Sequence, residues 1–104
     1  MASRVAWHLL SRGTRASTSV SVPDVFVPAC LTPGTTSLIV IHNHTSGDPT
    51  PSPDDARLTV RLCASADILD IGLLDHLIVG DAHRYFSSRE AGGLSASASD
   101  GNCP

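Results

Sequence analysis

The sequence predicts an α/β domain in which a mixed β-sheet is flanked by helices. Apolar runs typical of buried strands, at residues 37–42 and 73–79, alternate with a long segment of helical periodicity at 53–69. A hairpin is also expected at each end of this central unit. Strands that alternate with helices and end in hairpins favour a mixed sheet with helices packed on it.

Two interpretations of the first 23 residues remain open. The segment is rich in Ser and Thr and contains Arg but no acidic residue, which matches an organelle transit peptide. Alternatively, residues 5–10 are a short apolar run and residues 17–22 alternate Ser or Thr with Val, so both predict strands of the domain. We favour the domain interpretation, because targeting composition is the weaker signal.

The first helix is expected to start at Pro23–Asp24, because Pro and Asp are favoured in a first helical turn. Pro28 lies inside the helical pattern and should kink or shorten the helix. Thr32–Pro33–Gly34 should end it. Its apolar face is predicted to consist of Val25, Phe26, Ala29 and Cys30.

The longest helix is predicted over residues 53–69. Ser52 is a natural N-cap, and Pro53 suits the first helical position. Asp70–Ile71–Gly72 should end the helix. Its apolar stripe follows the spacing i, i+4, i+8 and i+11 through Leu58, Leu62, Ala66 and Leu69.

The C-terminal part of the domain is predicted to be a hairpin. Residues 73–79 and 84–88 read as strands, and residues 80–83 as the turn between them. From residue 92 onward the sequence has no apolar periodicity. We therefore expect a domain over residues 1–91 and a disordered tail over 92–104.

Three side chains suggest a metal site at the end of the central strand. His42 and His44 are two residues apart, so in a strand both imidazoles leave the same face. Asp55 lies in the first turn of the long helix. Acids there can simply complement the helix dipole, but capping does not explain two histidines at the end of a buried strand. His₂-carboxylate is the ligand set of a catalytic zinc site with a fourth position open for water, so we predict Zn²⁺.

The residues around this site resemble a known family. His42, His44, Ser52 and Asp55 fit, without a gap, the His-x-His, seven residues, Ser, two residues, Asp signature of the JAMM metalloproteases, which belong to the JAB/MPN domains. The surrounding sequence, including residues 74–80, is similar to the bacterial RadC-type proteins from about residue 6 to residue 94. Thr45 stands where that family usually has Pro. Longer members carry a further N-terminal segment, so this chain resembles their C-terminal domain alone.

The resemblance implies a fold, an activity and roles for four residues. The fold would be a cytidine-deaminase-like α/β sandwich, N-terminally truncated in this chain. The activity would be metal-dependent peptidase or isopeptidase hydrolysis, with Zn²⁺ on His42, His44 and Asp55. Ser52 would be a catalytic residue that donates a hydrogen bond to the oxyanion. The expected partner is a peptide or protein substrate.

The general base of the family has no clear counterpart here. JAMM hydrolases use a glutamate upstream of the His-x-His pair, whereas the one glutamate of this chain, Glu90, lies downstream. His8 lies where related sequences can carry an acid, but a surface histidine is the favoured interpretation. The alternative function is therefore a truncated or degenerate domain that acts as a non-catalytic binding module or, after the historical family label, as a DNA-repair accessory.

Asp75 and His76 also lie in the stretch that is similar to the RadC-type proteins. Adjacent residues in a strand face opposite ways, so they cannot both point at the zinc. Two interpretations stay open: one of them orients a ligand imidazole, or they cap the strand and face solvent. Asp48 is expected to shape the turn before the helix.

Composition excludes some partners. The formal net charge is −3 and the seven basic residues, all Arg, form no stripe, so direct nucleic-acid binding is not supported. No apolar run approaches the roughly 20 residues of a membrane span. The three cysteines are far apart and odd in number, which favours free thiols in a reducing compartment. A cytoplasmic location is expected.

Overall fold

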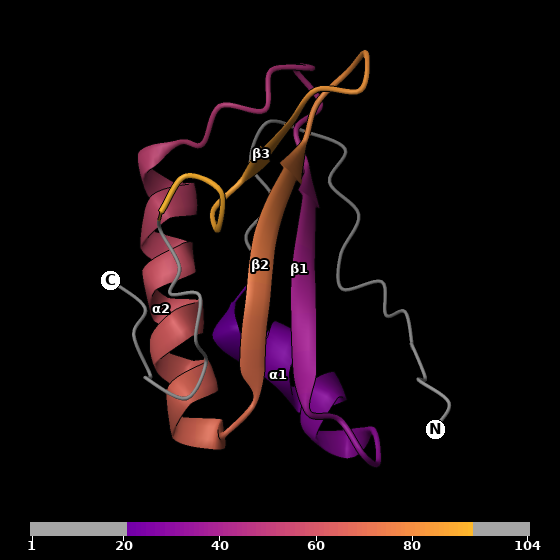
Figure 1. Cartoon of the computed structure of the whole chain (residues 1–104), viewed down its shortest axis with the longest axis vertical. Helices are drawn as coiled ribbons and strands as arrows, with labels where there is room; N and C mark the ends of the chain where they lie inside the picture. The colour runs from indigo at the N-terminus through magenta and orange to yellow at the C-terminus, as the bar shows by residue number, and fades with distance from the viewer. Residues whose placement is uncertain (1–20, 93–104) are drawn as a thin grey trace.

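The computed structural model describes residues 21–92, and within them it shows a three-stranded sheet and two helices. The strand order is β1-β2-β3, with β1 parallel to β2 and β2 antiparallel to β3. In Figure 1, α2 lies alongside the sheet. The predicted α/β class with a mixed sheet is confirmed. The elements are α1 (Val22–Leu31), β1 (Ser37–Asn43), α2 (Pro53–Leu69), β2 (Gly72–Val79) and β3 (Tyr85–Ser87).

Some predictions concern residues that the structure does not describe. The strand expected at 5–10, most of the strand expected at 17–22, the position of His8 and the tail after residue 92 lie outside the described residues. The prediction that the second strand continues through residues 21 and 22 is wrong. Ser21 is the N-cap of α1 and Val22 is already helical. A reciprocal pair of hydrogen bonds between Ser21 and Asp24 fixes that start.

Helix α1 contains Pro28 and still continues to Leu31. Pro28 has no N–H to donate to the carbonyl of Asp24, four residues earlier, so the helix lacks that one hydrogen bond but is not ended by it. The backbone N–H of Thr32 closes the helix on the carbonyls of Pro28 and Ala29. Of the predicted apolar face, Val25 and Phe26 are buried, whereas Cys30 is exposed.

Helix α2 begins and ends at the predicted residues. The Ser52 hydroxyl accepts from the Asp55 N–H at 3.1 Å, and the Asp55 carboxylate accepts from the Ser52 N–H at 2.7 Å. Asp70 takes a left-handed conformation, with φ of 56°, and ends the helix. Leu62 and Ala66 are buried as expected, but Leu69 is 43 % exposed because the last helical residue lies beyond the buried cluster.

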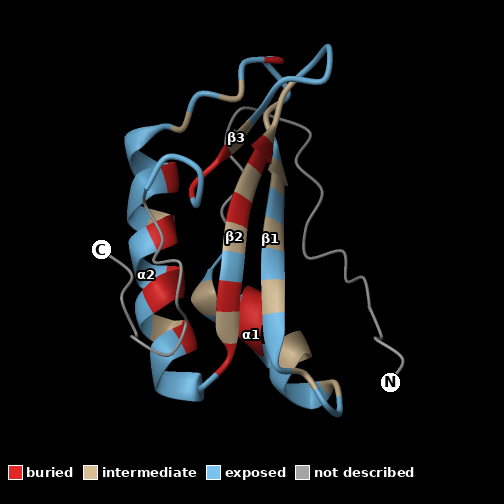
Figure 2. Cartoon of the chain, viewed as in Figure 1, coloured by how far each residue is buried: buried red, intermediate tan, exposed pale blue. Residues whose placement is uncertain are grey.

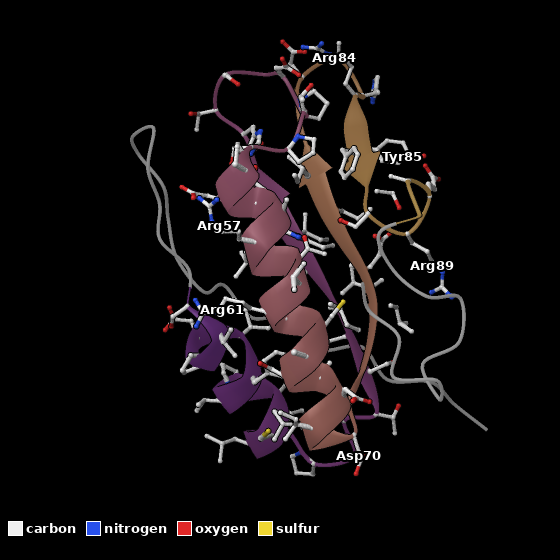
Figure 3. All side chains as sticks on the ribbon, turned by 90° about the vertical axis from the view of Figure 1, so that its left-hand side faces the viewer. Arg57, Arg61, Asp70, Arg84, Tyr85 and Arg89 are labelled. Atoms are coloured by element: carbon white, nitrogen blue, oxygen red, sulfur yellow. The ribbon has the colours of Figure 1, made fainter. Side chains whose placement is uncertain are left out.

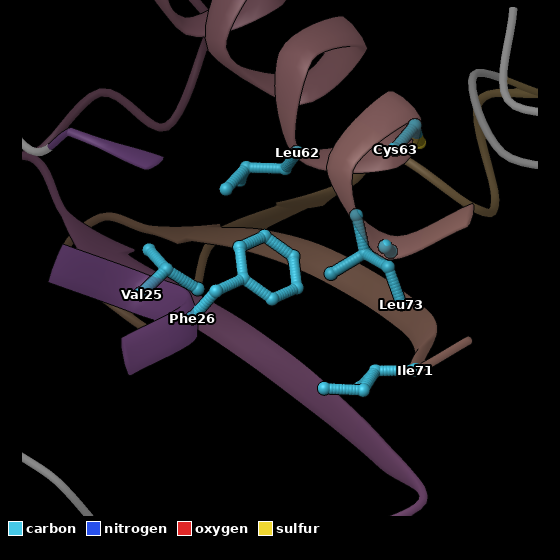
Figure 4. Packing of buried hydrophobic residues seen from close by; sticks show 7 residues of the cluster. Val25, Phe26, Leu62, Cys63, Ile71 and Leu73 are labelled. Carbon is cyan, nitrogen blue, oxygen red and sulfur yellow. The ribbon is translucent and has the colours of Figure 1, made fainter. Parts of the chain in front are cut away.

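The core lies between the two helices and one face of the sheet. Figure 4 shows Val25 and Phe26 of α1 near Leu62 of α2 and Leu73 of β2. The half-buried Leu38 and Val40 of β1 pack against the same cluster. Figure 2 shows that the buried residues of α2 lie on the side of the helix that faces β2. Burial of these side chains supplies the main driving force that holds α2 on the sheet.

A β-bulge changes which residues of β2 face the helices. Leu38 is opposite Leu73, but the next residue of β1, Ile39, is opposite Asp75. Leu74 is therefore an extra residue, and the alternation of side chains shifts by one after it. As a result His76 and Ile78, rather than Asp75, lie buried on the same side as Leu73.

The hairpin between β2 and β3 turns tightly. Ala82 and His83 both have positive φ values, 48° and 64°. Two consecutive left-handed residues form a type I′ loop, whose twist suits a hairpin. The Arg84 N–H donates to the Asp81 carbonyl at 2.8 Å and closes the loop. The predicted turn is confirmed, although β3 is shorter than expected.

Two further expectations can be compared with the structure. Among residues 21–92, no helix is long and apolar enough to cross a membrane. Cys30 is exposed and free. Cys63 is buried and disulfide-bonded, so the expectation of free thiols is wrong for that residue.

Candidate metal centre

The end of β1 and the first turn of α2 bring His42, His44 and Asp55 together. One ligand atom of each lies within 4.8 Å of those of the other two. His42 belongs to β1, and the His44 N–H donates to the Val79 carbonyl at 3.0 Å, which ties this segment to the end of β2. The sequence thus named three residues that the fold places in one cluster.

Asp55 is a buried carboxylate with three nitrogen atoms close to it. Oδ2 accepts from the Ser52 N–H and lies 3.0 Å from His44 Nε2, while Oδ1 lies 3.3 Å from His42 Nδ1. Burial on its own would raise the pKa of Asp55, but the hydrogen bonds with Ser52, together with the positive charge that His42 and His44 carry when protonated, outweigh burial and lower it. Asp55 is therefore ionised at neutral pH and is available as a ligand.

The loop carbonyl of Asp48 orients His44. His44 Nδ1 lies 2.9 Å from the Asp48 carbonyl oxygen, which can only accept, so Nδ1 carries the proton. In the neutral ring the lone pair is then on Nε2, the nitrogen 3.0 Å from Asp55. Two acceptors at that distance repel each other unless a cation or a proton lies between them. Fixing of the ligand tautomer through the other ring nitrogen is usual at zinc sites.

His42 completes the cluster with an unsatisfied nitrogen. Its Nδ1 is buried and has no hydrogen-bond partner, although Asp55 Oδ1 is nearby. Burial lowers the pKa of His42, and the neighbouring His44 lowers it further, against the opposing effect of Asp55. A neutral imidazole with a free buried nitrogen, a second oriented imidazole and a carboxylate suit Zn²⁺. The donor set therefore fits the predicted ion.

Ser52 lies beside this cluster at the start of α2. Its hydroxyl oxygen accepts from the Asp55 N–H. This contact leaves the hydroxyl proton free to donate, and Ser52 is exposed. The catalytic role expected for Ser52 remains a prediction that this geometry permits.

The sequence did not predict that His76 is fully buried next to His42. The Thr59 hydroxyl donates to the Asp55 carbonyl at 3.0 Å and accepts from His76 Nδ1 at 2.6 Å, which leaves Nε2 of His76 as an unpaired buried acceptor. The His76 and His42 rings are parallel to within 6°, with centroids 6.2 Å apart. His76 has no exposed surface, so the solvent-facing interpretation is wrong for it.

The Asp75 carboxylate stabilises the turn that follows β3. It accepts from the backbone N–H of His76 and of Arg89 and, at 2.5 Å, from the Ser87 hydroxyl. None of these partners is one of the three candidate ligands. Asp48 shapes its own loop as predicted, because its carboxylate accepts from both the N–H and the hydroxyl of Thr50.

We expect the metal-free protein to lose stability as the pH falls below about 6.5, in part through His76. Burial, together with the nearby His42, lowers the pKa of His76 from its usual 6.5. The unfolded chain therefore takes up a proton before the folded protein does, and stability present above pH 6.5 is lost below it. Each such group contributes a slope of up to about 1.4 kcal/mol per pH unit. Urea unfolding with a chelator, at pH 7.5 and pH 5, measures the loss.

A His76→Gln variant should show a smaller difference between these two pH values than the wild type. His83→Asn is the matched control, because His83 is exposed and Asn tolerates its left-handed backbone. It should keep the wild-type difference. An equal difference in His76→Gln would contradict the assignment.

Comparison with known proteins identifies the family of the chain. The family described as "RadC-like JAB domain" matches residues 2–94. A UPF0758 protein of Desulforudis audaxviator is 44 % identical over 90 residues, which are 86 % of this chain and 38 % of that protein. UPF0758 proteins of Roseiflexus castenholzii and Chloroflexus aurantiacus are 42 % and 44 % identical over 80 residues, 77 % of this chain and 34 % of each relative. The chain therefore spans about a third of the length of these curated relatives, and it belongs to the RadC-like JAB domain family.

Proposed function

We propose that this domain binds one Zn²⁺ and is the metal-site part of a peptidase or isopeptidase. The observation that carries the proposal is the cluster of His42, His44 and Asp55, in which a free buried nitrogen and an oriented lone pair face one carboxylate. These three side chains would hold the ion. Zinc, when bound, supplies Lewis-acid chemistry, because it lowers the pKa of water and polarises a carbonyl.

Three groups of the chain would support the bound ion and the substrate. Asp55 supplies negative charge and stays fixed by the helix cap, so it need not reorganise when the ion binds. The Asp48 carbonyl keeps the Nε2 lone pair of His44 directed at the cluster. The Ser52 hydroxyl would donate to the oxyanion of a peptide substrate, a type of contact that can contribute about 10²–10³ in rate.

A second candidate function is a zinc-binding module without catalysis. The observation that favours it concerns Glu90, the one glutamate of the chain, whose carboxylate accepts from the Tyr85 hydroxyl at 3.0 Å and is not part of the ligand cluster. No other carboxylate joins Asp55 in that cluster within the described residues. A general base would then have to come from elsewhere. A cytoplasmic location and a peptide partner are part of both candidates, whereas a DNA-repair role has no support in the charge of the chain.

Zinc content and peptide cleavage test the proposal together. Purified protein should contain about one zinc per chain, and a chelator followed by added zinc should remove and restore it. Cleavage of a peptide library that follows zinc content would support the hydrolase, and stoichiometric zinc without cleavage would support the binding module. Protein that takes up no zinc at either stage would overturn both.

A further inference from the structure

We infer that Arg84, in the β2–β3 hairpin, is a positioning residue for the candidate metal centre, acting on His44 through the loop that joins β1 to α2. The inference rests on the proposed zinc site. Arg84 is far from His44 in sequence and is not one of the ligands. Its side chain reaches the loop between the ligands, and the loop in turn orients the imidazole.

The contact between hairpin and loop centres on one carbonyl. The Gly47 oxygen accepts from Arg84 Nη2 at 2.7 Å and from the Asp81 N–H at 2.9 Å. The Asp81 carboxylate also accepts from the guanidinium, at 3.0 Å from Nε and 2.8 Å from Nη2. Gly47 is buried although the loop around it is largely exposed. We call this set of contacts, made by Arg84, Asp81 and Gly47, the hairpin clamp.

Two glycines let the backbones of the hairpin clamp meet. A Cβ added to Gly80 would lie 2.3 Å from the Gly47 oxygen. Gly47 itself has φ of 87°, and a Cβ there would lie 2.4 Å from the Asp81 carboxylate. The loop therefore lies directly against the hairpin: a side chain at position 80 would clash with the Gly47 backbone, and one at position 47 would displace the Asp81 carboxylate.

The hairpin clamp is one residue away from the group that fixes His44. The Gly47 N–H donates to the His44 carbonyl at 3.0 Å, and the next carbonyl, that of Asp48, accepts from His44 Nδ1. Arg84 thus holds the peptide unit that immediately precedes the orienting carbonyl. Without this anchor, the His44 ring loses its fixed tautomer and direction. Loss of a partner that orients a zinc ligand typically lowers metal affinity about 10–100-fold.

The structure offers a matched arginine for comparison. Figure 3 shows Arg84 at the end of the molecule opposite Asp70, whereas Arg61 lies along α2. Arg61 is also exposed. Arg84→Met keeps much of the length of the side chain but removes its donors, and Arg61→Met makes the same change away from the loop. Arg84→Lys restores a single donor.

The test measures zinc affinity by competition with a chelator and the tautomer of His44 by ¹⁵N NMR of the metal-free protein. Arg84→Met should weaken zinc binding about 10–100-fold and mix the His44 tautomers, Arg84→Lys should recover part of both, and Arg61→Met should change neither. Wild-type zinc affinity together with an unmixed Nδ1–H tautomer in Arg84→Met would overturn the inference.

Two further measurements distinguish failure of this inference from a folding defect and from failure of the proposed function. If Arg84→Met does not fold, Gly80→Ala tests the same contact from the backbone and should mix the tautomers in the same way. If the wild type binds no zinc, the proposed function fails, yet the tautomer in the metal-free protein still reports on Arg84. A wild-type tautomer in Gly80→Ala would count against the hairpin clamp.

Discussion

Replacement of both His42 and His44 by alanine is expected to abolish zinc binding. The double variant leaves Asp55 as the only member of the cluster, and one carboxylate does not hold zinc at neutral pH against water. Elemental analysis should fall from about one zinc per chain to none. A ligand that binds only the folded state stabilises it by about 4 kcal/mol at 1,000 times its Kd, so added zinc should raise the unfolding midpoint of the wild type alone.

Asp55→Asn separates the charge of Asp55 from its role in the helix cap. The amide oxygen can still accept from the Ser52 N–H, so α2 should keep its start while zinc affinity falls. His83→Asn, in the exposed hairpin turn, should behave as the wild type in every assay. Zinc that remains bound at full stoichiometry in the double variant would show that the ion, if any, lies elsewhere.

Local signals explain why parts of this structure could be predicted from the sequence. Ser52, Pro53 and Asp55 form a cap whose hydrogen bonds are made within four residues, so α2 begins where the sequence indicates. The same cap places Asp55 in the first turn. Strand geometry predicted that His42 and His44 share one face, and the ligand chemistry of zinc together with the family signature linked them to Asp55.

The parts that were missed depend on contacts between distant residues. The bulge at Leu74 appears only in the pairing of β1 with β2, yet it decides that His76 rather than Asp75 is buried beside His42. The Arg84 contact with Gly47 joins residues separated by 37 positions. Neither leaves a periodic signal in the sequence. At Ser21 a local signal was present, but the alternation of Ser and Val concealed the helix cap.

The chain in its present length is expected to be a slow hydrolase even when loaded with zinc. The ligands and the Ser52 hydroxyl are in place, but among the described residues no further carboxylate joins the cluster, and Glu90 is engaged by Tyr85. A positioned general acid or base typically contributes ~10²–10⁴ in rate. A version extended upstream through any encoded glutamate should therefore cleave the same peptide library faster by about that factor, when both proteins carry equal zinc.

His42→Ala in both lengths is the control that ties cleavage to the cluster. It should abolish activity in the short and the extended form alike, because His42 supplies the free buried nitrogen. Equal rates for the two lengths, both lost in His42→Ala, would mean that the base belongs to the chain as it stands. His76 would then be the first residue to test, because its Nε2 is an unpaired acceptor beside His42. A His76→Gln variant that keeps its zinc but loses the residual rate would assign the proton transfer to that nitrogen.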